Sequence, residues 1–338
     1  EDEDYSVNYE TGIITILNES LTTVKVAFKW GDISAIDDEA VAGLTTPSRT
    51  GIQALVNAQT VTGFTPKILG APGWAHKKVV GDALVSVANK LKARCYIDAD
   101  TDTNNTISEI IAARAVTEDV FIIHEKRANL LFPNLMAAGV EYPASVAAMG
   151  VRSRTDMDPE LGYHHSISSQ KINGFDGISI PVEYSINNKS AESQLLNAAG
   201  ICTIKNSNGL KFCGNENSSF DRNNNGNTDH ERFETTMTTG DVIETSIELS
   251  SEDDIDKPMT TQWVKKVVRK TKAFLRRLKA RGAILGGDCW YVPAENETDD
   301  LAAGEIQFRT DDAATPPVNR MKFQRAYNAD YFASLGGE

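Results

Sequence analysis

Between residues 48 and 177, short apolar runs alternate with amphipathic segments, and this alternation constrains the fold more than any other feature of the chain. The runs "PKILGAP", "RCYID" and "DVFIIHE" are short and bounded by turn or polar residues, which predicts buried strands. Strands that alternate with helices favour a parallel sheet with helices on both faces. We therefore predict an α/β core with a mostly parallel sheet flanked by helices.

The segments between these runs have the features of helices. Residues 76–93 place Val80, Leu84, Val87 and Leu91 on one stripe of a helix. The tetrapeptide "TISE", Thr106 to Glu109, is a capping box and predicts a helix through about Val116. Residues 49–63 and 143–154 are predicted to be helical as well.

The alternation is weaker on either side of this core. Before it, "TGIITIL" and "TTVKVAFKW" predict strands, and we interpret residues 1–47 as the remaining part of a β-rich domain. We assign residues 48–250 to the α/β core, which includes a helix ending at Gly200, a strand after it and another strand at 241–249. Residues 251–338 are predicted to form a C-terminal α+β domain, with a helix from Thr261 to about Arg281 and strands at 287–293, 304–310 and 319–327.

The charge of the chain limits its partners. The formal net charge of −13 argues against a general nucleic-acid binder, because phosphate binding needs clustered basic residues. Residues 263–281 nevertheless hold nine Lys or Arg and no acid. This asymmetry favours contacts with further copies of the chain or with an acidic partner.

Other sequence signals exclude several classes of protein. No apolar run approaches the ~20 residues that a membrane-spanning helix needs, and no signal-peptide pattern opens the chain. The chain does not begin with Met, so we expect a processed product or a fragment. The four cysteines lack C-x-x-C spacing, and we expect reduced thiols.

Three polar segments carry residues that could bind metal. Asp98, Asp100, Asp102 and Glu109 resemble a calcium loop, but Thr103 stands where the loop needs Gly. Asp221, Asn223, Asn225 and Gly226 form a second near match, with Arg232 in place of the final Glu. A strand end and Asx-rich turns explain both segments without metal.

The third segment, residues 154–177, raises the alternative of a metal-dependent α/β hydrolase. Its candidate ligands are Asp156, Asp158, His164 and His165. On a strand, the two adjacent histidines would point to opposite faces, and the spacing needed to aim both rings at one ion is missing. No nucleophile elbow and no phosphate-binding loop occur in the chain. We therefore expect no cofactor and no metal, and favour a structural role for this segment.

Six segments carry a recognisable pattern: "TGIQALVNAQTVTGFTPKILGAPG", "YPASVAAMGVRSRTDMDPELGYHHSISSQKINGFDGI", "LLNAAGICTI", "GLKFCGNENS", "DKPMTTQWVKKVVRKTKAFLRRLKARGAILG" and "LAAGEIQFRTDDAATPPVNRMKFQRAYNADYFASL". In this order, they resemble segments of the contractile tail sheath proteins of bacteriophages and R-type bacteriocins. The resemblance covers about residue 50 to the end. It implies that the β-rich domain at 1–47 is part of a β-sandwich-like insertion domain, since residues 1–45 match the insertion that precedes this core in many sheath proteins. Ser169, Cys202, Cys213 and Tyr163 depart from residues usual in the family.

This resemblance implies a structural, non-enzymatic subunit of a virion tail sheath. Such subunits form six-fold rings stacked around an inner tail tube, assembled in the bacterial cytoplasm, and contract to drive the tube through the host envelope. The implied partners are further copies of the chain, the tube protein, and the baseplate and tail terminator proteins, without nucleic acid or membrane insertion. The family's longer N-terminal region and arm have no counterpart in this chain, so we expect weakened assembly.

Three groups of residues are candidates for these contacts. The tube or subunit interface is assigned to the basic helix, and the pairing of a terminal strand between subunits to residues 319–327. The polar loop at 154–177 is assigned a structural role, with glycines at its turns. The residues are Lys265, Lys266, Arg269, Lys272, Arg276 and Lys279 on the helix; Met321, Phe323 and Tyr327 on the strand; and Arg154, Asp156, Gly162, Gly174 and Gly177 in the loop.

Overall fold

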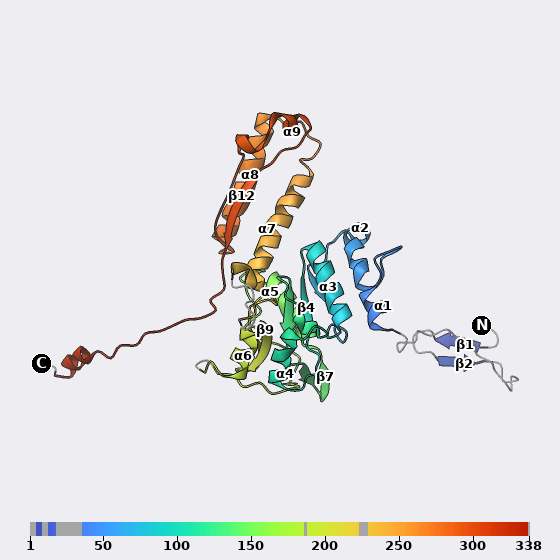
Figure 1. Ribbon diagram of the computed structural model, residues 1–338, viewed down its shortest axis with the longest axis vertical. Helices are drawn as coiled ribbons and strands as arrows, with labels where there is room; N and C mark the ends of the chain where they lie inside the picture. Colours follow the sequence, from blue (N-terminus) through green and yellow to red (C-terminus); the bar gives the residue numbers. More distant parts are fainter. Residues whose placement is uncertain (1–4, 9–12, 18–35, 186–187, 223–228, 337–338) are drawn as a thin grey trace. The chain divides into compact units, whose positions relative to one another are not determined.

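The computed structural model describes residues 5–8, 13–17, 36–185, 188–222 and 229–336. The chain divides into two units, residues 1–37 and residues 38–338 (Figure 1). In the first unit, strands β1 (Tyr5–Asn8) and β2 (Ile13–Ile16) pair antiparallel, with Tyr5 opposite Ile16. The strand expected at 22–30 lies outside the described residues.

A five-stranded mixed sheet forms the centre of the second unit in the described part of the chain. Four of its strands run parallel, and the fifth, β10, pairs antiparallel with β9. The expected α/β sheet is thus present. The strand order is β10 (Leu210–Cys213), β9 (Ile201–Asn206), β5 (Ala128–Leu131), β4 (Arg94–Asp98) and β3 (Ile68–Gly70).

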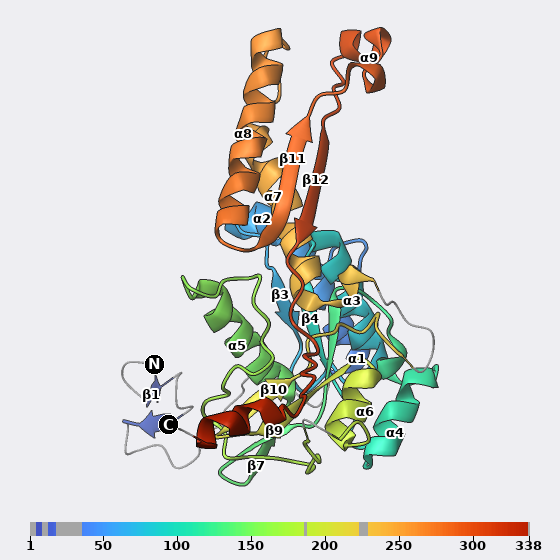
Figure 2. The ribbon, with the colours of Figure 1, turned by 90° about the vertical axis from the view of Figure 1, so that its left-hand side faces the viewer.

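Helices cover both faces of this sheet. Figure 2 shows β3 and β4 between α5 (Ala144–Met157) and α3 (Lys78–Leu91). Successive strand residues alternate between two cores, because strand side chains point to opposite faces. Cys95 and Ile97 pack in the core that contains α3, whereas Tyr96 packs in the core that contains α5.

The third strand lies later in the sequence than expected. Residues 120–122 of "DVFIIHE" form a short 3-10 helix, η4 (Val120–Ile122), and β5 (Ala128–Leu131) takes the place in the sheet. The Asp119 side chain caps η4 by accepting a hydrogen bond from the Phe121 amide at 2.8 Å. The buried Arg114 guanidinium donates to the carbonyls of Phe121 and Ile123, both at 2.6 Å. These side chains satisfy backbone groups that a strand would have paired in a ladder.

The strand expected at 241–249 is also wrong, because these residues belong to helix α7 (Glu234–Glu252). Thr238 and Thr239 are buried, and their hydroxyls donate to the carbonyls four residues earlier, both at 2.8 Å. Ile243 and Ile247 are one turn apart and pack in one core. Packing therefore overrides the strand preference of these β-branched residues.

The C-terminal part of the second unit contains the expected long helix, α8 (Thr261–Ala280), beside a two-stranded sheet (Figures 1 and 2). Strands β11 (Ile284–Trp290) and β12 (Arg309–Ala314) pair antiparallel. The strand predicted at 287–293 overlaps β11. The strand predicted at 304–310 is wrong except at its last two residues, because the chain forms α9 (Thr298–Ala302) and a loop before β12.

The remaining elements are short. The capping box at Thr106 is present at the start of α4, as predicted. All four cysteines are free and buried. The other described elements are α1 (Asp38–Ala42), η2 (Gly51–Asn57), α2 (Ala58–Thr62), α4 (Ile107–Ala112), η3 (Ala113–Ala115), β6 (Leu135–Ala137), β7 (Val140–Tyr142), β8 (Gly177–Ile178), α6 (Glu192–Ala198), η5 (His230–Arg232), η6 (Pro293–Glu295) and η7 (Ala329–Gly336).

Candidate assembly interface

Helix α8 separates an apolar face from a basic face. Leu275 and Leu278 are buried and pack with Ile284 of β11 and Ile243 of α7. Val264 and Val268 are half-buried. The basic residues occupy the remaining circumference, as the helical period requires.

Both ends of α8 are fixed by local hydrogen bonds. At the start, the Thr260 hydroxyl accepts from the Trp263 amide at 3.2 Å. At the end, Gly282 adopts a φ of 78°, and the Ala283 amide donates to the Leu278 carbonyl at 3.1 Å. This left-handed glycine and its paired amides form a Schellman motif, which turns the chain directly into β11. The basic face is therefore carried on a helix of defined length.

Two of the six basic candidates on α8 pair with acids of the same chain. Lys266 lies 3.0 Å from the buried Asp254 carboxylate, and Lys272 lies 2.8 Å from Asp288. The acidic stretch before α8 contains Asp254, but the sequence does not show that this residue is buried under lysines. Four candidates are exposed and form no ion pair with the described residues: Lys265, Arg269, Arg276 and Lys279.

The β11–β12 sheet has an unpaired edge on each strand within the described chain. Most residues of β12 are exposed, whereas Ile284 and Cys289 of β11 are buried. An edge strand presents free N–H and C=O groups that can pair with another strand. This sheet can therefore accept a strand from outside the chain.

The C-terminal arm, defined here as residues 315–336, leaves large apolar side chains uncovered. Phe323 is 88% exposed, Tyr327 73% and Met321 71%. The strand predicted at 319–327 does not form within the described chain, because this segment pairs with no other strand. Near the start of the C-terminal arm, the Asn319 side chain donates to the buried Glu216 carboxylate at 2.6 Å.

The polar segment at 154–177 does not form a cluster of ligands. Asp156 accepts from the Arg152 guanidinium at 2.8 Å, and Arg152, fully buried, also donates to the His165 carbonyl at 2.7 Å. His164 and His165 lie in a turn, with ring centroids 4.5 Å apart, so the expectation of diverging rings on a strand does not apply. The His165 ring contacts the Leu161 carbonyl through Nδ1. Burial lowers the pKa of His164 and favours its neutral form.

The other loop candidates have separate local roles. Arg154 donates to the Lys171 carbonyl at 2.5 Å. Gly162 and Gly174 adopt φ values of 75° and 86°, in the left-handed region that favours glycine. Gly177, which we expected in a turn, instead lies in β8 and pairs with Met136 of β6.

The first calcium-like segment lacks the ligand arrangement of a calcium loop. The Asp98 carboxylate accepts from the Ser145 amide and hydroxyl at 2.8 and 2.6 Å, and Glu109 completes the capping box. In the second segment, Asp221 is buried, and its carboxylate lies 3.9 Å from the Arg114 guanidinium. Asn223, Asn225 and Gly226 lie outside the described residues.

Comparisons with known proteins agree on one family, although no protein-family model matches the sequence. The chain is 30% identical over 293 residues to the tail sheath protein of Escherichia phage P2, covering 85% of this chain and 69% of that protein. It is 29% identical over 353 residues to the tail sheath protein of Burkholderia phage BcepMu, covering 100% and 72%.

Solved structures show the same fold. A chain of the sheath complex of an extracellular contractile injection system (PVC), in its contracted state, matches with a TM-score of 0.64 at 16% identity, over 83% of this chain and 76% of that one. A chain of the anti-feeding prophage baseplate matches with a TM-score of 0.62 at 16% identity, over 81% and 73%. The chain belongs to the tail sheath protein family. Among the described residues, no helix has both the length and the apolar character required to cross a membrane.

Proposed function

We propose that this chain is a structural subunit that polymerises with further copies into a contractile sheath around an inner tube. The C-terminal arm carries this proposal, because its large apolar residues are uncovered in the single chain. When another surface covers exposed apolar side chains such as these, the free energy falls. The open edges of the β11–β12 sheet offer such a surface on a second copy.

Pairing by strand addition explains which arm residues matter. In a strand, residues two apart share a face, so Met321, Phe323 and Tyr327 would project from the same side of the arm. Backbone hydrogen bonds to an edge strand would supply affinity, and these three side chains would supply specificity. A contact between two different surfaces can repeat from copy to copy, and it generates a helical polymer when the rotation does not close a ring.

Contraction requires two arrangements of the same subunits. A compact subunit joined to its neighbours by strand links can rotate as a body while the links persist. The relatives named as tail sheath proteins and the PVC sheath in its contracted state support this role. We assign the tube contact to the exposed basic face of α8 and the arm contacts to residues 251–338, and we propose binding to baseplate and tail terminator proteins at the sheath ends.

This role is structural and involves no catalytic step. The hydrolase alternative receives no support. Asp156 is bound to Arg152, and the His165 ring contacts the Leu161 carbonyl within the turn. In the particle, the subunit would belong to the tail sheath, with assembly in the bacterial cytoplasm before release.

The test compares two aspartate substitutions on the arm. We expect Phe323→Asp to abolish sheath formation, because it places a charge in the proposed contact between copies. Gln324→Asp is the matched control, since it adds the same charge at an exposed neighbour that would face the opposite side. Negative-stain microscopy scores striated tubes, and circular dichroism confirms that both variants fold. Normal sheaths from Phe323→Asp would refute the arm contact.

A further inference from the structure

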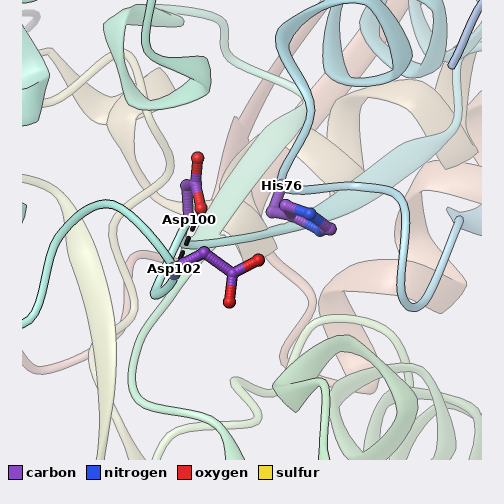
Figure 3. Close-up of side chains that lie close together, drawn as sticks. All are labelled: His76, Asp100 and Asp102. Carbon is purple, nitrogen blue, oxygen red and sulfur yellow. Dashed lines mark hydrogen bonds between the residues drawn. The ribbon is translucent and has the colours of Figure 1, made fainter.

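Three potential metal ligands from two loops meet beside the central sheet (Figure 3). His76 lies between β3 and α3, and Asp100 and Asp102 follow β4. Strands β3 and β4 are parallel neighbours, so their carboxyl ends lie at one edge of the sheet. This edge is where loops of open α/β sheets gather binding groups.

The three side chains are close enough to share one ion. One ligand atom from each, an imidazole nitrogen or a carboxylate oxygen, lies within 4.8 Å of the other two. The Asp100 carboxylate is held in place by its own turn. The Asp102 amide donates to Asp100 Oδ1 at 3.2 Å, and the Thr103 hydroxyl donates to Asp100 Oδ2 at 2.6 Å. Such supporting hydrogen bonds orient carboxylate ligands in metal sites.

His76 supplies the third potential ligand. Its imidazole is half-buried, and neither ring nitrogen has a hydrogen-bond partner among the described residues. An imidazole nitrogen is a common metal ligand, and the His76 ring brings one close to two carboxylate oxygens.

The composition of the site selects the class of ion. Asp98 and Glu109, which would complete a calcium loop, are occupied by Ser145 and by the α4 cap. The donors that remain are one imidazole and two carboxylates. Imidazole suits Zn²⁺, Co²⁺ and similar ions, whereas Ca²⁺ and Mg²⁺ prefer oxygen ligands alone.

We propose that His76, Asp100 and Asp102 bind one divalent transition-metal ion of the Zn²⁺ type, which joins the loop before α3 to the loop after β4. Three protein ligands leave the fourth tetrahedral position to water or to a group from another molecule. The site lies outside the C-terminal arm and the basic face of α8, so it is independent of the assembly contacts proposed above.

Cobalt and zinc titrations of the full chain test this site. We expect one Co²⁺ per chain, detected by its visible absorption, and displacement of that ion by Zn²⁺. Loss of a ligand in His76→Ala or Asp102→Asn should weaken binding at least about tenfold, since loss of even an outer-shell partner costs about 10–100-fold. The exposed His230 provides the matched control variant, His230→Ala, which should bind as the original chain does.

Two readouts keep the result interpretable. Asp102 is exposed, and Asp102→Asn preserves its shape, so folding of this variant can be confirmed by circular dichroism before titration. Zn²⁺ should also raise the unfolding temperature of the original chain but not that of His76→Ala. Absence of stoichiometric Co²⁺ binding, or unchanged affinity in His76→Ala, would overturn the proposal. Binding of Ca²⁺ in preference to Co²⁺ would also overturn it, because Ca²⁺ prefers oxygen ligands and the His76 imidazole would then not be a ligand.

Discussion

Asp98 shows how one buried carboxylate connects the sheet to a helix. It ends β4, and its oxygens accept hydrogen bonds from the amide and hydroxyl of Ser145 in the first turn of α5. A carboxylate at a helix N-terminus also interacts favourably with the helix dipole. Desolvation outweighs these donors and raises the pKa of Asp98 from 3.8 to about 6. The folded chain therefore binds a proton at Asp98 more tightly than the unfolded chain does.

This shift predicts a pH dependence with a definite sign. Between about pH 4 and pH 6, the folded state holds the Asp98 proton and the unfolded state releases it. The contribution of Asp98 to the free energy of unfolding should rise as the pH falls from 7 to 4. Urea unfolding of the original chain and of Asp98→Asn measures it, and the original chain should gain relative to the variant on acidification. Glu118→Gln, at an exposed position, serves as the control. A pH-independent difference between the original chain and Asp98→Asn would contradict the assignment.

Gly200 predicts a second, purely steric effect. It has a φ of 74°, and an added Cβ would lie 2.0 Å from the Phe220 carbonyl oxygen. Gly174 has a φ of 86° but open space around it. Gly174→Ala should therefore cost only the left-handed strain, about 1–2 kcal/mol. Gly200→Ala should cost about 3–5 kcal/mol, the upper range for one substitution. Chemical denaturation measures both, and equal losses would show that the backbone at Gly200 moves away freely.

Local residue roles could be predicted from the sequence, but distant ones could not. The capping box joins Thr106 to Glu109, three residues apart, and its pattern is sufficient to recognise it. Asp98 and Ser145 are 47 positions apart, so only the fold shows that they meet. The same limit applies to His76, which the sequence places well apart from Asp100 and Asp102.

At the scale of elements, helix α7 is attached to the sheet by a buried polar contact. The Tyr96 hydroxyl of β4 donates to the Glu234 carboxylate, in the first turn of α7, at 2.6 Å. Arg94 lies 3.6 Å from the same carboxylate. Because Glu234 is buried, loss of the hydroxyl would leave its charge less compensated.

Tyr96→Phe should therefore reduce the free energy of unfolding by about 1–3 kcal/mol, the usual cost of removing one partner of a buried polar group. Tyr163→Phe is the matched control, because the Tyr163 hydroxyl is buried without a partner among the described residues. Its removal should be neutral or slightly stabilising. Urea unfolding distinguishes the two. If both variants lose the same stability, the contact with Glu234 contributes nothing specific.

Elements with long amphipathic patterns were predicted well. Helices α3 and α8 each have a continuous apolar stripe, and both appear near their expected bounds. Helix α7 and η4 were missed because β-branched and aromatic residues mimic strands in short windows. Their actual structures depend on buried threonine hydroxyls and on Arg114, which no local pattern reports.

At the scale of the whole molecule, charge is distributed so that one helix differs from the rest. The chain carries −13 overall, yet α8 presents Lys265, Arg269, Arg276 and Lys279 without acidic partners among the described residues. Copies with the same net charge repel one another, whereas a basic face attracts any acidic surface. This asymmetry could be read from the sequence. The structure adds that Lys266 and Lys272 form ion pairs with acids of the same chain.

The double variant Lys265→Glu with Arg269→Glu tests whether this face binds the inner tube. Both side chains are exposed in the first half of α8, where glutamate is compatible with the helix dipole, so the helix should persist. Co-sedimentation with the tube should fall at least tenfold, by about 1.4 kcal/mol or more. Tube binding by the original chain should also weaken with salt, because the Debye length falls from about 10 Å at 0.1 M to about 3 Å at 1 M. Lys90→Glu with Lys189→Glu changes the net charge equally at exposed positions outside α8 and should bind normally. The two double variants have the same net charge and differ only in where the substitutions lie. Equal tube binding by both would therefore place the tube contact on a surface other than the basic face of α8.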